Sequence, residues 1–182
     1  MGRPKMLLPW GGTTVLGQVV DTYAAAGICD LIVVTGAEQE KIEQLLTTLA
    51  AKYPVRSIHN NAYQQGEMLS SLQCGLMALE PGTQAALIGL GDQPQLQATA
   101  VLSILAAFEK SDSRVIVPSY RMRRGHPWLV RKSLWGELLA LRAPHTPRDF
   151  LNAHAAEIEY VPVDTPAVLE DLDTPEDYQR HL

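Results

Sequence analysis

Short apolar runs that alternate with helix-like patterns are the feature that most constrains the fold of this 182-residue chain. Three runs are typical of buried parallel strands, and each leads into polar or turn residues. These runs are residues 31–34, 85–90 and 115–117, the last expected to end at Pro118. Between the runs, apolar residues recur at helical spacing over residues 14–26, 38–53, 68–79 and 99–110. Strands that alternate with helices predict an α/β fold whose mainly parallel sheet is covered on both faces.

The C-terminal third follows a less regular pattern. Helices are expected over residues 131–141 and 146–156, and residues 158–163 alternate like an edge strand. A final helix is expected near the C-terminus, with Thr174 or Asp173 as its N-terminal cap. This part of the chain therefore adds to the same sheet and helix layers.

Composition indicates one globular domain over residues 1–182, because neither an internal repeat nor a linker divides the chain. The formal net charge of −5 argues against a nucleic-acid partner. No apolar run reaches the roughly 20 residues of a membrane span. Cys29 and Cys74 lie apart from each other and from any histidine cluster, so neither a zinc site nor a disulfide is indicated. An early charge and proline do not fit a signal peptide, which favours the cytoplasm.

Asp92 is the best-placed candidate for chemistry, because ligands of open α/β sheets bind beyond the carboxyl ends of the strands. Gly91 before it permits close backbone approach, and Pro94 after it fixes the turn. A carboxylate at this point can hold Mg²⁺ against a phosphate oxygen. The structural alternative is a turn or helix-capping aspartate.

A second acidic cluster contains Asp171 and Asp173. Two carboxylates from distant parts of the chain can converge on one metal ion. The alternative is a solvated capping box, in which Thr174 or Asp173 reaches Glu176 or Asp177. Only convergence in space decides between the two interpretations.

Two further segments offer contacts for a nucleotide. Lys5, close to Arg3, can act as a point charge on a triphosphate, or it belongs to an exposed charged terminus. Residues 66–75 are expected to open a helix with the hydroxyl residues Ser70 and Ser71. Backbone N–H groups at such a helix start can receive an anion or a sugar, whereas plain helix packing is the alternative.

An arginine-rich segment follows the third strand and is expected to form a loop. Its guanidinium groups, from Arg121, Arg123 and Arg124, suit an acidic or phosphorylated substrate, or they form a solvated charge run. Gly125 and His126 complete the segment, and His126 either positions the loop or carries a proton.

Taken in order, these segments resemble the molybdenum cofactor cytidylyltransferases and their guanylyltransferase relatives in the MobA-like NTP transferase family. The resemblance covers nearly the whole chain and is carried by residues 1–12, 66–75, 91–94, 124–127 and 171–178. It implies a Rossmann-like three-layer sandwich of the nucleotide-diphospho-sugar transferase type. It also implies that an NTP donates a nucleoside monophosphate to a phosphorylated acceptor and that pyrophosphate is released.

The resemblance also implies roles for individual residues. Lys5 and Asp92 would be catalytic, with Lys5 on the triphosphate and Asp92 on Mg²⁺; Asp173 would be the second metal ligand, with Asp171 as the competing assignment. The implied nucleotide contacts are Lys5, Ser70, Ser71, Gly91 and Asp92, and the implied acceptor contacts are Arg124, Gly125 and His126. Such a reaction depends on positioning and charge stabilisation rather than on a covalent nucleophile.

The donor and acceptor are implied more finely by two segments. Residues 70–72 and 124–127 look more like those of cytidylyl than of guanylyl transferases, which favours CTP as the donor and a molybdopterin-type acceptor. A molybdoenzyme or its maturation chaperone would then be the protein partner. The alternatives are a non-catalytic module that binds and delivers a cofactor, and a sugar-phosphate nucleotidyltransferase.

The chain departs from the family pattern at its start. The family has an apolar strand and a Leu-Ala-Ala-Gly-x-Ser-x-Arg loop before the Met-Gly that is Met1-Gly2 in this chain. We therefore expect a sheet without its usual first strand, a chain that is truncated relative to the family, and weak binding of CTP, because glycine N–H groups of that loop would cradle the phosphates.

Overall fold

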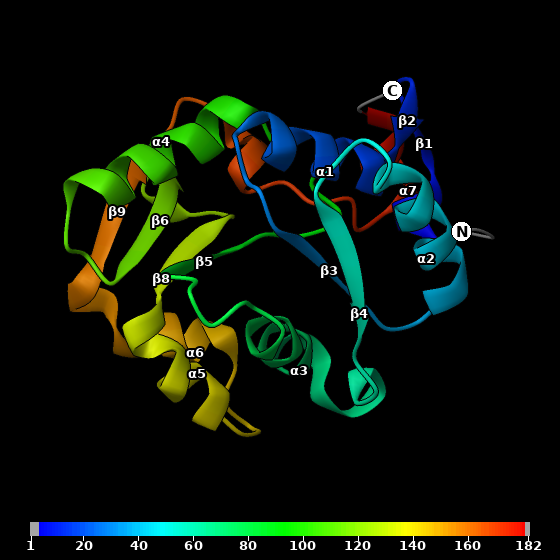
Figure 1. Ribbon diagram of the computed structural model, residues 1–182. Coiled ribbons are helices and arrows are strands. Elements are labelled where there is room, and N and C mark those ends of the chain that lie inside the picture. Colours follow the sequence, from blue (N-terminus) through cyan, green and yellow to red (C-terminus); the bar gives the residue numbers. More distant parts are fainter. Residues whose placement is uncertain (1–3, 181–182) are drawn as a thin grey trace.

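The computed structural model describes residues 4–180, except for the side chains of residues 66 and 67, and Figure 1 shows how its elements are arranged. The helices are α1 (Val15–Ala25), α2 (Gln39–Leu49), α3 (Tyr63–Met77), α4 (Ala98–Lys110), α5 (Trp135–Ala140), α6 (Pro147–Ala153) and α7 (Pro175–Arg180). The strands are β1 (Pro9–Trp10), β2 (Thr13–Thr14), β3 (Leu31–Thr35), β4 (Val55–His59), β5 (Ala85–Ile88), β6 (Val115–Tyr120), β7 (Arg123–Arg124), β8 (Trp128–Arg131) and β9 (Ile158–Pro162). Among the described residues, no helix has the length and apolar character needed to cross a membrane.

The main sheet has five strands in the order β5, β8, β6 and β7, with β9 on the other side of β6. Strands β5, β6 and β9 run in one direction, and β8 lies antiparallel between β5 and β6. A second, parallel pair is formed by β3 and β4. Strands and helices alternate along the chain, so the predicted α/β fold is confirmed.

The five-stranded sheet and the β3–β4 pair are not joined by strand pairing. No hydrogen-bonded strand links β3 to β5 within residues 4–180, although Leu31 of β3 and Leu87 of β5 pack in one apolar cluster. Unpaired strand edges are normally covered or completed in native sheets. The interruption lies on the β3 side of β5, and the expectation that a first strand is missing stays a prediction.

Side chains of the main sheet alternate between two cores. Val115 and Val117 of β6 face the cluster that contains α3, α5 and α6, whereas Ile116 faces the cluster of α4. Figure 1 shows these helix layers on opposite sides of the sheet. Burial of one such side chain contributes about 1.5–3 kcal/mol, and a one-residue slip would send every side chain to the wrong face. Alternation thus fixes the register of the strands that end at the candidate site.

The strands of the structure differ from the predicted ones, as β6 and β4 show. Strand β6 does not end at Pro118 but continues to Tyr120, because the Pro118 carbonyl still accepts a hydrogen bond from Gly125 N at 2.9 Å. Proline can occupy a strand where its missing N–H is not needed. Strand β4 was not predicted, since its residues are partly polar and two of its five side chains are exposed.

Helix α3 begins earlier than predicted. Its start is set by Asn60, whose carbonyl accepts from Tyr63 N at 3.2 Å and whose Oδ1 accepts from Ala62 N at 2.9 Å. Ser70 and Ser71 therefore lie inside the helix, where backbone N–H groups are used by the helix itself. The prediction that they open a helix and offer free N–H groups to an anion is wrong.

Candidate functional site

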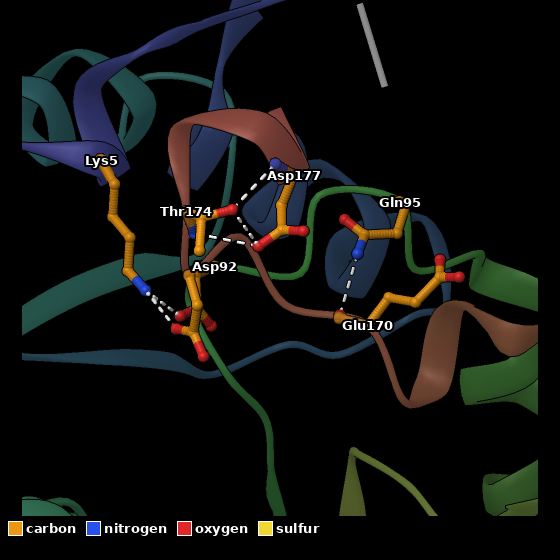
Figure 2. A network of polar contacts seen from close by, with 7 residues as sticks. Lys5, Asp92, Gln95, Glu170, Thr174 and Asp177 are labelled. Atoms are coloured by element: carbon orange, nitrogen blue, oxygen red, sulfur yellow. Dashed lines mark hydrogen bonds and ion pairs between the residues drawn. The ribbon is translucent and has the colours of Figure 1, made fainter. Parts of the chain in front are cut away.

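Lys5 lies between two carboxylates that are far apart in the sequence. Its Nζ is 2.6 Å from Asp92 Oδ2 and 3.2 Å from Asp173 Oδ1. Figure 2 shows the lysine reaching from the N-terminal segment to Asp92, which lies in the turn after β5. The predicted convergence of Asp92 and Asp173 is therefore present, and we call these three residues the acidic centre.

The acidic centre is assembled by backbone contacts between the strand end and the C-terminal segment. Leu172, only 1% exposed, anchors the segment in the core, and its N–H donates to the Asp92 carbonyl at 3.1 Å. Gln95 Nε2 donates to the Glu170 carbonyl at 2.9 Å, which adds a second tether (Figure 2). Asp173 follows Leu172 directly, so the position of one carboxylate fixes the position of the other.

Thr174 settles the competing interpretation of the acidic segment. Its hydroxyl donates to Asp177 Oδ2 at 2.7 Å and accepts from Asp177 N at 3.1 Å, which caps α7 (Figure 2). Such a cap contributes about 1 kcal/mol. The capping interpretation therefore holds for Thr174 and Asp177, whereas Asp173 contacts Lys5 and its role as a metal ligand stays a prediction.

The charges of the acidic centre influence one another. Burial lowers the pKa of Lys5, but the hydrogen bonds and charges of Asp92 and Asp173 outweigh it and raise this pKa above its ordinary value. Burial, followed by the charges of Asp173 and Asp92, raises the pKa of Asp171. Lys5 is therefore protonated at neutral pH, and Asp171 lies within the electrostatic reach of both carboxylates.

The donor set of the acidic centre fits a divalent cation. The two carboxylate oxygens that contact Lys5 Nζ are no more than about 6 Å apart, a separation that one cation can bridge. Within residues 4–180, no group of three or more histidine, cysteine or acidic side chains is arranged to hold a metal ion. The remaining ligands of such an ion would be phosphate oxygens and water, as is usual for Mg²⁺.

Gly91 lies beside the acidic centre and packs against the N-terminal segment. A Cβ at this position would be 3.4 Å from both Sδ and Cε of Met6, which is an ordinary contact. The structure therefore places the predicted nucleotide-side residues Lys5, Gly91 and Asp92 together. It places Ser70 and Ser71 elsewhere, where Asn60 Nδ2 donates to their hydroxyls at 2.8 and 3.1 Å.

A cavity of about 1250 Å³, which we call the large cavity, is lined by His126, and His126 interacts electrostatically with Asp92 of the acidic centre. The large cavity is lined by the predicted acceptor residues Arg124, Gly125 and His126, together with Ser70. Among the described residues, Lys5 and Asp92 are not part of its wall. The structure thus separates a charged centre from a roomy neighbouring cavity, and it groups Ser70 with the acceptor residues rather than with the nucleotide residues.

The arginine-rich segment is a hairpin rather than a loop. Strands β6 and β7 pair through Tyr120 and Arg123, and the two residues at the tip, Arg121 and Met122, have φ angles of 49° and 65°. Arg124 Nε donates to Tyr160 Oη and its Nη1 to Asn152 Oδ1, both at 2.8 Å. The prediction of a loop holds for the turn at Arg121 and Met122 but is wrong for Arg123 and Arg124, which pair with β6.

His126 links the large cavity to the acidic centre. The backbone N–H of His126 donates to the Val168 carbonyl at 2.8 Å, and the backbone N–H of Gly125 donates to the Pro118 carbonyl at 2.9 Å. The segments that contain Val168 and Pro118 therefore both hold His126 in place. Burial lowers the pKa of His126 to about 4, although the charge of Asp92 acts in the opposite direction. The imidazole is therefore neutral at pH 7.

We expect His126 to make stability depend on pH. Its ordinary pKa is 6.5 and its folded pKa is about 4, so the unfolded chain binds a proton in this window that the folded chain does not. The contribution of the neutral, buried imidazole to the free energy of unfolding is fully present above pH 6.5 and is lost as the pH falls towards 4. Between pH 7 and pH 4.5, urea unfolding of the wild type should lose about 2–3 kcal/mol more stability than that of His126→Asn. Parallel pH profiles of the two proteins would contradict this account.

Three residues of the large cavity escaped the sequence analysis. Trp128, on β8, is 1% exposed, and Arg142 and Arg148 lie in and after the turn between α5 and α6. With His145, the two arginines repeat a basic residue every third position from 142 to 148. That spacing could have indicated a basic surface in the sequence. Only the packing of α5 and α6 against the sheet shows that these basic side chains face a cavity.

Comparisons with known proteins extend over nearly the entire chain. The family model of the MobA-like NTP transferase domain matches residues 1–158. The nicotine blue oxidoreductase of Paenarthrobacter nicotinovorans is 28% identical over 194 residues, which cover 100% of this chain and 90% of that protein. The crystal structure of Rv0371c from Mycobacterium tuberculosis H37Rv has a TM-score of 0.82 and 26% identity, covering 99% of this chain and 89% of that chain. A structure of the same protein in complex with manganese has a TM-score of 0.78 and 27% identity, with 100% and 92% covered.

Proposed function

Because the chain belongs to the MobA-like NTP transferase family, we propose that it transfers CMP from CTP to a phosphorylated acceptor and releases pyrophosphate. The observation that carries this proposal is the position of Lys5 Nζ between Asp92 and Asp173. A lysine and two carboxylates at a strand end suit a reaction that depends on charge stabilisation.

Asp92 and Asp173 would hold Mg²⁺, with Asp171 as a further candidate ligand. The Lys5 ammonium already occupies the position between the two carboxylates, which supports a cation site there. The manganese complex of the similar protein Rv0371c also supports a divalent ion. When bound, such an ion supplies positive charge against the phosphate groups.

Different residues of the chain would bind the nucleotide donor and the acceptor. Lys5, protonated at neutral pH, would contact the triphosphate. Gly91, which has no side chain, would let the triphosphate approach the backbone there. Arg124, the Gly125 backbone and the neutral His126 position the acceptor in the large cavity. The phosphate of the acceptor is the attacking group, and the α-phosphorus bond to pyrophosphate breaks as the new bond forms. Ser70 lines the large cavity, so its hydroxyl group would face the acceptor rather than the nucleotide.

The size of the large cavity favours a molybdopterin-type acceptor over a sugar phosphate. Its volume of about 1250 Å³ exceeds the range of roughly 300–1,000 Å³ that is common for small-molecule pockets. A small sugar phosphate would leave much of this space to water. A molybdoenzyme or its maturation chaperone would receive the product.

Pyrophosphate release tests the proposed function. We expect the protein to release labelled pyrophosphate from γ-labelled CTP only when Mg²⁺ and a molybdopterin-type acceptor are both present, and more slowly from GTP. Binding of the acceptor without pyrophosphate release would instead identify a delivery module. Release with a hexose 1-phosphate as acceptor would identify a sugar-phosphate nucleotidyltransferase.

The full-length similarity to nicotine blue oxidoreductase favours a second candidate, an oxidoreductase that acts on nicotine blue or a similar substrate. This reaction needs neither an NTP nor a pair of metal-binding carboxylates. Bleaching of nicotine blue by the protein with NADH or NADPH, unaffected by Asp92→Asn, would support this candidate against nucleotidyl transfer.

A further inference from the structure

The large cavity has a strongly one-sided charge. Its described lining residues include no aspartate or glutamate, whereas four arginines line it, Arg123, Arg124, Arg142 and Arg148, together with His145 and the neutral His126. The whole chain has a formal net charge of −5, so this is a local concentration of positive charge. A cavity of this kind attracts anions.

The arginines that line the cavity take part in no described ion pair. Within residues 4–180, the arginines in ion pairs are Arg56, Arg114 and Arg180, none of which lines the cavity. Arg124 is held by neutral partners, and Arg142 Nη1 donates to the carbonyls of Leu139 and Leu141 at 2.7 and 2.6 Å. Arg148 is exposed in the first turn of α6; its charge acts on the neighbouring Asp149 carboxylate, but no hydrogen bond or ion pair between the two is among the described contacts.

Arg142 and Arg148 lie at the far end of the cavity from the acidic centre. They come from the α5–α6 region, which Figure 1 shows on the opposite side of the molecule from the N-terminal segment and α7. His126 lies at the end of the cavity nearer to the acidic centre, where the charge of Asp92 acts on its imidazole. An anion held by the distal arginines is therefore separate from a phosphate at the acidic centre.

The indole N–H of Trp128 is a second, independent indication that the cavity binds a ligand. Its side chain is 1% exposed and lines the cavity, yet its indole N–H has no hydrogen-bond acceptor among the described residues. The other buried indole, that of Trp135, donates to the Val130 carbonyl at 3.2 Å. An unsatisfied buried donor costs about 1–3 kcal/mol. Met68, Leu69 and Leu151 make the surrounding wall apolar.

We propose that the large cavity binds a flat, ring-containing anion, with its ring against the Trp128 wall and its charged group at Arg148 and Arg142. This inference deepens the proposed function, on which it rests for the identity of the ligand as acceptor: the acceptor carries a second anionic group, remote from the attacking phosphate. Arg148 and Trp128 then determine which acceptor is used.

Flavin mononucleotide and riboflavin are suitable probes, because they share one ring system and differ in a terminal phosphate. Binding to the full chain is measured by calorimetry and by quenching of flavin fluorescence, without NTP or metal. We expect flavin mononucleotide to bind about tenfold more tightly than riboflavin, as a charge-assisted arginine contact would give. Equal binding of the two, or binding of neither, would overturn the proposal.

Arg148→Ala locates the anion. It should weaken flavin mononucleotide about fivefold to tenfold and leave riboflavin within about twofold, since only the charged group is lost. Lys110→Ala, at the end of α4 outside the cavity, removes the same charge and should change neither affinity. Equal losses in both variants would show a general charge effect and refute the site.

The test separates this inference from the proposed function. Probe binding requires only the cavity, so it can succeed in a protein that releases no pyrophosphate. In that case the cavity stands and nucleotidyl transfer fails. If pyrophosphate is released while Arg148→Ala leaves flavin mononucleotide binding unchanged, the transfer stands and the distal anion site fails.

Discussion

Asp92→Asn is expected to lower nucleotidyl transfer by about three orders of magnitude, because the neutral amide can neither bind a divalent ion firmly nor stabilise the charge of Lys5. Asp92 is the less exposed of the two carboxylates, at 16% against 69% for Asp173. Asp173→Asn should therefore cost less, about tenfold. Steady-state release of pyrophosphate measures both losses, and Asp164→Asn, an exposed aspartate with no described contact in the site, serves as the control.

Lys5→Met distinguishes a metal site from a purely structural ion pair. Removal of the ammonium from between Asp92 and Asp173 should raise the affinity for Mn²⁺ about tenfold, since the lysine competes for the same oxygens, yet it should lower turnover. Asp92→Asn should lower both quantities. If the two variants instead lose stability equally and leave Mn²⁺ affinity unchanged, the three residues only fasten the N-terminal segment.

The arrangement of most helices and buried strands could be predicted from the sequence because their apolar periodicity is strong. Residues 14–26 became α1 with Thr14 as cap, and Gly27, with a φ of 87°, follows its end. Strand β8 was missed, since residues 128–130 were given no element and Arg131 was expected to begin a helix. Its antiparallel insertion between β5 and β6 depends on long-range pairing, which local patterns do not encode.

The candidate site could be predicted only in part. Lys5, Asp92 and Asp173 were each visible as polar residues in a suggestive position, but their meeting depends on the hydrogen bond from Leu172 N to the Asp92 carbonyl. Burial of Trp128 without a hydrogen-bond partner depends on how β8 packs under α5 and α6. Such properties belong to the packed structure, and no spacing in the chain indicates them.

Gly125→Ala should destabilise the protein by about 3 kcal/mol and open the large cavity. A Cβ at Gly125 would lie 2.4 Å from the Val168 carbonyl oxygen and 2.8 Å from Val168 Cβ, and backbone cannot turn away as a flexible side chain can. Relief of this clash would stretch the 2.8 Å bond from His126 N to the same carbonyl. Gly136→Ala is the matched control, because nothing lies within 4 Å of its Cβ and α5 should gain up to about 1 kcal/mol. Urea unfolding checks both values, and a Gly125→Ala protein as stable as the wild type would mean that this close approach does not hold His126 in place.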